Sequence, residues 1–150
     1  MTERVDFYVL KSAAPKQRWA FACRLTEKAY LKNLKVVVLS DTLEETQALD
    51  ELLWTFNERS FVPHKVCADG KSVDPATPVH LTSEASAITA ADLLINLGRR
   101  LPAHFQGYTR IAEVIDADDE RRRLGRERFK TYRDLKLPLE THQIEESADV

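Results

Sequence analysis

The chain has 150 residues, of which 43% are hydrophobic and 31% charged, and its formal net charge is −2. This length and composition are those of one globular domain with a hydrophobic core. The small negative charge excludes a polycation that coats nucleic acid, so any basic function must be local. Two cysteines, Cys23 and Cys67, are too few for a disulfide framework.

The N-terminal residues show no basic start followed by an apolar segment, and therefore no signal peptide is indicated. No apolar run approaches the roughly 18 residues that a membrane-spanning helix requires. We therefore expect a cytoplasmic protein.

Short apolar runs alternate with helical patterns along the chain. Pro15 opens a predicted helix whose apolar positions recur at three- and four-residue steps, and Thr42 and Glu45 have the capping-box spacing that begins a second one. A third helix is predicted over the basic stretch after Asp118, because acidic side chains stabilise a helix N-terminus. The predicted strands are residues 5–10, 36–39, 78–81, 93–97, 111–115 and, at the end, 139–144.

The alternation of strands and helices predicts βαβ units, and thus a mainly parallel sheet with helices on both faces. Residues 57–77 are predicted to be a long connection, and the polar loop 68–77 within it has no assigned role. Residues 145–150 are expected to be a frayed tail. No repeat or composition change marks a boundary, so residues 1–150 are interpreted as a single α/β domain.

The residues that usually mark a catalytic or cofactor site are missing from this sequence. The four glycines form neither a dinucleotide-binding nor a P-loop pattern, so we expect no phosphate-binding loop. The four histidines are scattered, and none has metal-ligand spacing to another histidine, cysteine or glutamate. We expect no catalytic residue, no metal and no cofactor.

The most distinctive segment is the basic stretch from Arg121 to Lys136, which holds eight basic side chains against two acidic ones. On a helix that turns about 100° per residue, one face should place an aromatic ring among cations, and the opposite face should point to the core. The outer face comprises Arg122, Arg126, Phe129, Lys130 and Arg133. The core side comprises Leu124, Tyr132 and Leu135.

An exposed aromatic ring among cations suits an acidic partner that also buries an apolar group. Arginine pairs with carboxylates through two parallel hydrogen bonds, and the C-terminal carboxylate of a peptide is one such ligand. Two other interpretations stay open. The arginines can pair with the acidic residues at 116–120 and in the C-terminal tail, or the stretch can bind nucleic-acid phosphate.

A second group of aromatic residues lies at the end of the second predicted helix and in the loop after it. Its members are Trp54, Phe56, Phe61 and the residues that follow, Val62, Pro63 and His64. Loops at this position often contact partners. The same rings can instead close the edge of the core, and the sequence does not distinguish the two.

Two long strings in these segments, LDELLWTFNERSFVPH (49–64) and GRERFKTYR (125–133), resemble the chi subunit family of bacterial DNA polymerase III holoenzyme. The strings VDFYVL, ACRLTEKAY and DLLINL, in the family's order, extend the resemblance over most of the chain. It implies a Rossmann-like α/β fold that has no nucleotide-binding loop and no catalytic activity of its own, and that serves as an accessory subunit of the polymerase.

The resemblance also implies two partners. The acidic, Phe-ending C-terminal tail of single-stranded DNA-binding protein (SSB) would bind the basic helix, with Arg126 and Lys130 on its carboxylates, Phe129 on its terminal ring, and Arg122 assisting. Family members often carry Tyr where Phe129 stands. The psi subunit, which leads to the clamp loader, would bind the aromatic region of Trp54, Phe61, Val62, Pro63 and His64. An XPD-like helicase is an alternative partner of that region.

The leading hypothesis is thus a replication adaptor that contacts nucleic acid only through SSB. A module that binds single-stranded nucleic acid directly is the alternative, although one basic helix with a single exposed aromatic residue is a poor track for a strand. A small nucleotide-handling enzyme is a third possibility, against which the missing glycine loop argues.

Overall fold

The computed structural model describes residues 2–59, 61–67 and 73–144. Its strands form one sheet in the order β3-β4-β2-β5-β6-β1-β7, and every described pair is parallel. The strands are β1 (Arg4–Leu10), β2 (Val36–Leu39), β3 (His64–Val66), β4 (Val79–Thr82), β5 (Ala91–Asn96), β6 (Tyr108–Ile115) and β7 (Leu139–Ile144). The predicted α/β fold class is confirmed.

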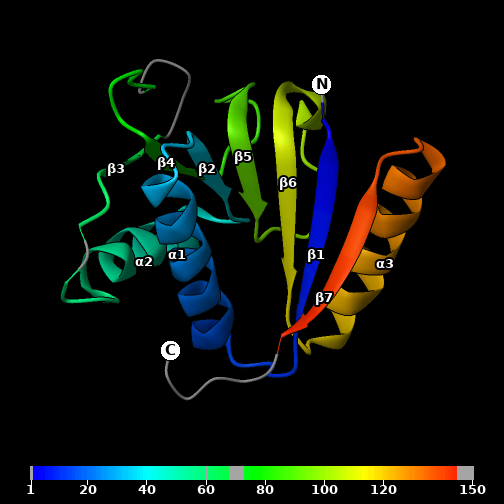
Figure 1. Cartoon of the computed structure of the whole chain (residues 1–150). Helices are drawn as coiled ribbons and strands as arrows, with labels where there is room; N and C mark the ends of the chain where they lie inside the picture. Colours follow the sequence, from blue (N-terminus) through cyan, green and yellow to red (C-terminus); the bar gives the residue numbers. More distant parts are fainter. Residues whose placement is uncertain (1, 60, 68–72, 145–150) are drawn as a thin grey trace.

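Helices lie on both faces of this sheet, as predicted. The helices are α1 (Pro15–Leu31), α2 (Leu43–Thr55) and α3 (Asp119–Asp134), with a 3-10 turn at Phe105–Gly107. Figure 1 shows α1 and α2 on one side of the molecule, and α3 beside β7 on the other. None of the helices in the described part of the chain is long and apolar enough to cross a membrane.

The ends of the helices follow from local sequence signals. Pro15 occupies the first turn of α1, and the chain leaves that helix through Asn33 at φ 63°, a left-handed conformation that asparagine tolerates. The Thr42 side chain accepts a hydrogen bond from the Glu45 N–H at 3.1 Å, which confirms the predicted cap of α2. Asp118 caps α3 in the same way through the Arg121 N–H at 2.9 Å.

The apolar core has two layers, one on each face of the sheet. The first packs Ala22, Cys23 and Leu49 of α1 and α2 against β2, β4 and β5. The second contains Tyr132 of α3 and Ile88, which lies in the connection between β4 and β5. This connection covers part of the second face without a helix, so α3 is the only described helix on that side.

Several expectations from the sequence are wrong or incomplete. Strand β3 falls inside the segment predicted to be a long connection, because three residues are too few to show a periodicity. Leu135 does not face the core but is 49% exposed, because the helix ends at Asp134 and the chain turns at Lys136 with φ 62°. The frayed tail predicted for 145–150 and the first half of the polar loop, residues 68–72, lie outside the described residues.

Candidate functional site

A groove of about 330 Å³ opens between α3, the sheet and β7. This volume lies within the roughly 300–1,000 Å³ that small-ligand sites occupy. Its floor and walls are Phe7, Val9 and Ile115 from β1 and β6, Arg122, Gly125, Arg126 and Phe129 from α3, and Thr141 and Gln143 from β7. The helix approaches the sheet closely here, since a Cβ on Gly125 would lie 2.4 Å from Cδ1 of Ile115.

Phe129 lies at the wall of this groove rather than on the open outer surface that the helical projection indicated. It is partly buried, and its ring meets that of Phe7 edge to face with 5.2 Å between the centroids. The prediction that Phe129 stands outside the buried stripe is therefore wrong in part. The observed position of Phe129 suits a binding site better than the predicted one, because the ring forms an apolar wall beside cations.

The cationic side chains around the groove differ in whether a carboxylate already pairs with them. Arg122 is partly buried, and it donates from Nε to the Asp116 carbonyl and from Nη2 to the Leu10 carbonyl, each at 3.1 Å. These acceptors are neutral, so none of the described carboxylates pairs with its positive charge. Arg126 and Lys130 are exposed, and neither has an ion-pair partner among the residues that the structure describes. Arg122 and Arg126 thus supply two available cations at the groove, and Lys130 follows Phe129 on the same helix.

Some arginines of the helix do pair with neighbouring acids, but these are not the arginines that line the groove. Arg123 pairs with Glu120 at 2.6 Å and with Glu127 at 3.3 Å, and Arg121 lies 3.6 Å from Asp116. Arg133 has a looser contact with Asp134 at 3.8 Å. Any pairing with the acidic tail lies outside the described residues.

Arg128 belongs to the basic stretch but points into the protein. Its Nε donates to Glu113 at 3.1 Å, and Glu113 also accepts from the Tyr132 hydroxyl at 2.8 Å and the Asn96 amide at 2.9 Å. Burial raises the pKa of the Glu113 carboxyl, and the charge of Arg128 opposes that shift. This network joins α3 to β5 and β6 and so fixes the helix that carries the groove-lining side chains.

The aromatic region predicted at the second site divides into an exposed part and a buried part. Trp54 is 45% and Phe61 66% exposed, and their ring centroids are 5.3 Å apart. Val62 is buried in the core, and the His64 ring is held by the Val62 carbonyl at 2.7 Å and the Asp50 carbonyl at 3.1 Å. Pro63 is half-buried between them. Only the two exposed rings are placed to meet a partner.

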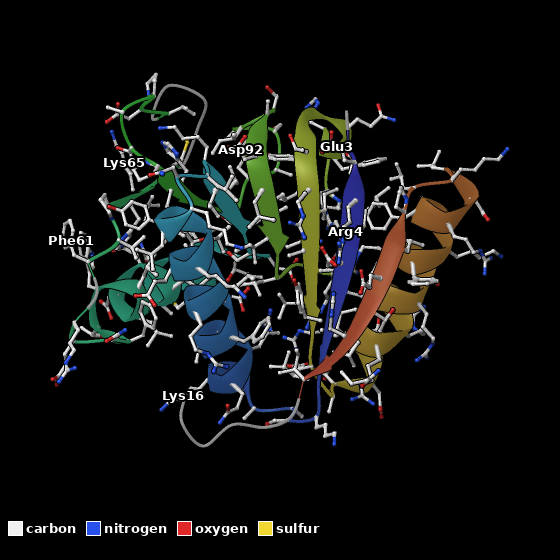
Figure 2. The ribbon with its side chains drawn as sticks, in the orientation of Figure 1. Glu3, Arg4, Lys16, Phe61, Lys65 and Asp92 are labelled. Atoms are coloured by element: carbon white, nitrogen blue, oxygen red, sulfur yellow. The ribbon has the colours of Figure 1, made fainter. Side chains whose placement is uncertain are left out.

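The two candidate sites lie at opposite edges of the sheet. His64 begins β3, the strand at one edge, and β7 at the other edge borders the groove. Figure 2 shows Phe61 on the β3 side of the molecule, with α3 on the far side. The two surfaces are therefore separated by the width of the sheet.

A third polar cluster unites groups that no spacing rule in the sequence would connect. Asp6, Glu140 and His142 bring one potential metal-ligand atom each to within 4.8 Å of one another. Asp6 is already bonded to Arg110 at 3.0 Å and to Arg4, whose guanidinium also contacts Glu140. Two arginines thus form ion pairs with these carboxylates. The cluster is therefore an ion-pair network, and it lies on the sheet face that carries α1.

The carboxyl ends of the strands, where Rossmann-like folds often bind nucleotides, carry a pocket of mixed charge. Three carboxylates, Asp41, Glu44 and Glu45, line it together with Arg99 and Arg121. A phosphate group would meet more negative than positive side chains there. This agrees with the lack of a phosphate-binding loop in the sequence.

Sequence reasoning found the cations of the groove but missed its floor. Phe7, Val9 and Ile115 were assigned to strands, yet nothing in the strand pattern indicated which face α3 would cover. Gly125 offered a signal, because a glycine within a helix often marks a close approach of another element.

The chain is an α/β domain of Rossmann-like topology without a glycine-rich phosphate loop, and an apolar groove with a cationic rim lies at one edge of its sheet. Residues 1–140 match the family model described as "DNA polymerase III chi subunit, HolC". The chain therefore belongs to the DNA polymerase III chi subunit family, a family of accessory subunits of the replication machinery.

Curated relatives cover nearly the whole length. The DNA polymerase III subunit chi of Pseudomonas aeruginosa is 34% identical over 141 residues, which are 94% of this chain and 96% of the relative. That of Haemophilus influenzae is 27% identical over 145 residues, 96% of this chain and 99% of the relative. That of Escherichia coli is 24% identical over 119 residues, 79% and 80% of the two chains.

Proposed function

We propose that this chain is a non-catalytic adaptor that binds the acidic, Phe-ending C-terminal tail of SSB in the α3 groove. The observation that carries the proposal is an apolar wall beside cations that have no carboxylate partner among the described residues. Phe7 and Phe129 form the apolar surface, Arg122 and Arg126 line the groove beside it, and Lys130 follows Phe129 on α3. A peptide that ends in an aromatic residue supplies both a ring and a carboxylate to such a site.

The roles within this site follow from the hydrogen bonds. Arg122 is held by two carbonyls, and therefore its guanidinium is positioned for a terminal carboxylate at little entropic cost. Arg126 and Lys130 extend the positive field along the helix and suit the acidic residues that precede the end of the tail. Arg133 lies one turn further and adds to the same field.

The other half of the proposal assigns the opposite edge to a second replication protein. The exposed pair of Trp54 and Phe61 suits an apolar partner surface, which is the chemistry expected for the psi subunit and, through it, the clamp loader. An XPD-like helicase is the alternative occupant of this surface. His64 packs against Trp54 with 4.0 Å between the ring centroids, and Val62 and Pro63 follow Phe61 directly in the chain.

A peptide titration tests the SSB assignment. A synthetic peptide with acidic residues and a C-terminal Phe should bind with an affinity that falls as salt rises, because ion pairs at the rim are screened. Arg126→Ala combined with Lys130→Ala should weaken binding strongly. Lys28→Ala combined with Lys32→Ala is the matched control, since these exposed lysines have the same four-residue spacing, in the last turn of α1 and at its C-cap.

The alternatives give different outcomes in the same assay. A peptide with a C-terminal amide should bind roughly ten-fold or more weakly, because it loses a charge-assisted hydrogen bond. Equal affinity of both double variants for the peptide would reject the site. Tight, salt-sensitive binding of a single-stranded oligonucleotide without SSB would instead favour the direct nucleic-acid-binding module.

A further inference from the structure

The strand that borders the groove is also an edge of the sheet. Among the strands that the structure describes, β7 pairs only with β1. An edge strand presents backbone donors and acceptors on its open side, and these can pair with an added strand. The peptide site of α3 thus adjoins an unpaired backbone edge.

The register shows which backbone groups of β7 are unpaired. Val5 lies opposite Leu139, and the Val5 N–H donates to the Pro138 carbonyl at 2.9 Å. In a parallel ladder the bonded residues alternate, so Glu140 and His142 turn their backbone groups toward β1. The N–H and C=O groups of three residues then point away from the sheet: Leu139, Thr141 and Gln143.

The same alternation directs side chains to the groove. Thr141 and Gln143 both line it, and both are exposed. A peptide whose last residue enters the groove therefore passes next to outward-facing donors and acceptors of these two residues. Main-chain pairing of this kind gives affinity, while pockets for individual side chains give specificity.

We propose that the acidic peptide adds to β7 as a further strand parallel to it, with its C-terminal residue in the groove. This inference rests on the function proposed above and describes how the residues before the peptide's end are held. The direction follows from Arg122, whose bonds to the Leu10 and Asp116 carbonyls place it at the carboxyl end of β1 and β6. The terminal carboxylate belongs there, so the peptide must arrive from the amino end of the sheet.

The spacing of the cations agrees with a parallel peptide. A helix rises about 1.5 Å and a strand about 3.3 Å per residue. With the terminal carboxylate near Arg122, Arg126 therefore lies level with a peptide residue roughly two positions earlier, Lys130 with one roughly four positions earlier, and Arg133 with one roughly five positions earlier. Acidic side chains at those positions would meet a cation each.

Hydrogen exchange of backbone amides, measured by NMR, tests the added strand directly. In the protein alone, the amides of Thr141 and Gln143 should exchange quickly, while that of His142 is protected by its bond to β1. A saturating amount of the acidic, Phe-ending peptide should slow exchange at Thr141 and Gln143 by an order of magnitude or more, with little change at His142. Unchanged exchange at both residues with the peptide bound would overturn the inference.

Two sets of variants supply an independent test. Thr141→Pro removes an outward N–H and leaves the hydrogen bonds between β7 and β1 in place. It should lower the affinity for the peptide roughly three- to ten-fold, as expected for one lost hydrogen bond. Thr141→Val keeps the N–H and serves as the control. Peptides methylated at one backbone nitrogen at a time leave the protein unaltered, and they should lose affinity at every second position only.

The outcomes separate this inference from the proposed function. Failure of the peptide to bind at all would reject both. Binding that depends on Arg126 but tolerates every backbone methyl group would keep the groove as the SSB site and reject the added strand. Loss of affinity at alternate positions, together with protection of Thr141 and Gln143, supports the strand.

Discussion

Arg128 lies in the middle of the basic helix, yet its Nε donates to Glu113 across 3.1 Å and both side chains are buried. Arg126, two positions earlier, is exposed at the rim of the groove. Neighbouring arginines of one helix thus serve different purposes. Arg128 holds the helix on the sheet, and Arg126 is available to a ligand.

We predict that Arg128→Ala destabilises the protein by about 3–5 kcal/mol, because it leaves the Glu113 carboxylate buried without its cation. Urea denaturation measures this change. Arg126→Ala is the matched variant and should leave the free energy of unfolding nearly unchanged while it weakens the peptide. If the two variants have the same stability, the division of roles is wrong.

The second prediction concerns pH and the ion-pair network on the sheet face that carries α1. Burial alone would raise the pKa of Asp6, but hydrogen bonds from His142, Arg110 and Arg4 outweigh it and hold the pKa below its ordinary value of 3.8. The stability that Asp6 contributes is thus present above 3.8, and it is lost as the pH falls through the lower pKa of the folded state.

Asp6→Asn should therefore be less stable than the parent protein at neutral pH, and the difference should shrink as the pH falls below 3.8. Urea denaturation at a series of pH values measures both curves. Glu140→Gln is the control, because Glu140 is exposed and its loss leaves the bonds of Asp6 to Arg110 and His142 in place. If the difference in the free energy of unfolding between Asp6→Asn and the parent protein stays constant with pH, the lowered pKa of Asp6 is refuted.

The third prediction compares two glycines that each approach another element closely. A Cβ on Gly107 would lie 1.8 Å from the Thr89 carbonyl oxygen, a backbone atom that cannot move without shifting its loop. Gly107→Ala should therefore cost about 1–3 kcal/mol of stability. At Gly125 the nearest atom is the flexible end of Ile115, and alanine also favours the helix. Thermal unfolding should show a clear loss for Gly107→Ala and little for Gly125→Ala.

The fourth prediction distinguishes a residue that stabilises the fold, Val62, from one that is proposed to contact a partner, Phe61. Val62 is buried, so Val62→Ala should lower the free energy of unfolding by roughly 1.5–3 kcal/mol. Phe61 is largely exposed, and Phe61→Ala should alter stability little while it weakens the binding of a psi subunit. Denaturation together with a pull-down of purified psi measures both effects. A stability loss for Phe61→Ala as large as that for Val62→Ala would place Phe61 in the core.

Much of the fold was accessible from local patterns. The capping pair of Thr42 and Glu45, Pro15 at a first turn and Asp118 before the basic helix each depend on neighbours in the sequence, and each was predicted correctly. Strand β3 was missed because its three residues, which start at His64, show no periodicity and pair only through the tertiary fold.

The candidate site was accessible only in part. The helical projection correctly turned Tyr132 inward, but it left out Arg128, because a charged residue is not expected in a core unless its partner is known. That partner, Glu113, belongs to β6 and can be identified only once the strand order is known. The floor of the groove depends on the same order, since Phe7 and Thr141 become neighbours only when β7 pairs with β1.

The position of β1 has a consequence for the synthesis of the protein. Among the described strands β1 is made first, whereas its two neighbours, β6 at Tyr108–Ile115 and β7 at Leu139–Ile144, are made last. The growing chain must therefore carry β1 unpaired at least until residues 108–115 have left the ribosome. Pairings so distant in sequence close slowly, and an exposed strand invites aggregation. The groove is lined in part by β7, so a nascent chain cannot form it before residues 139–144 have emerged.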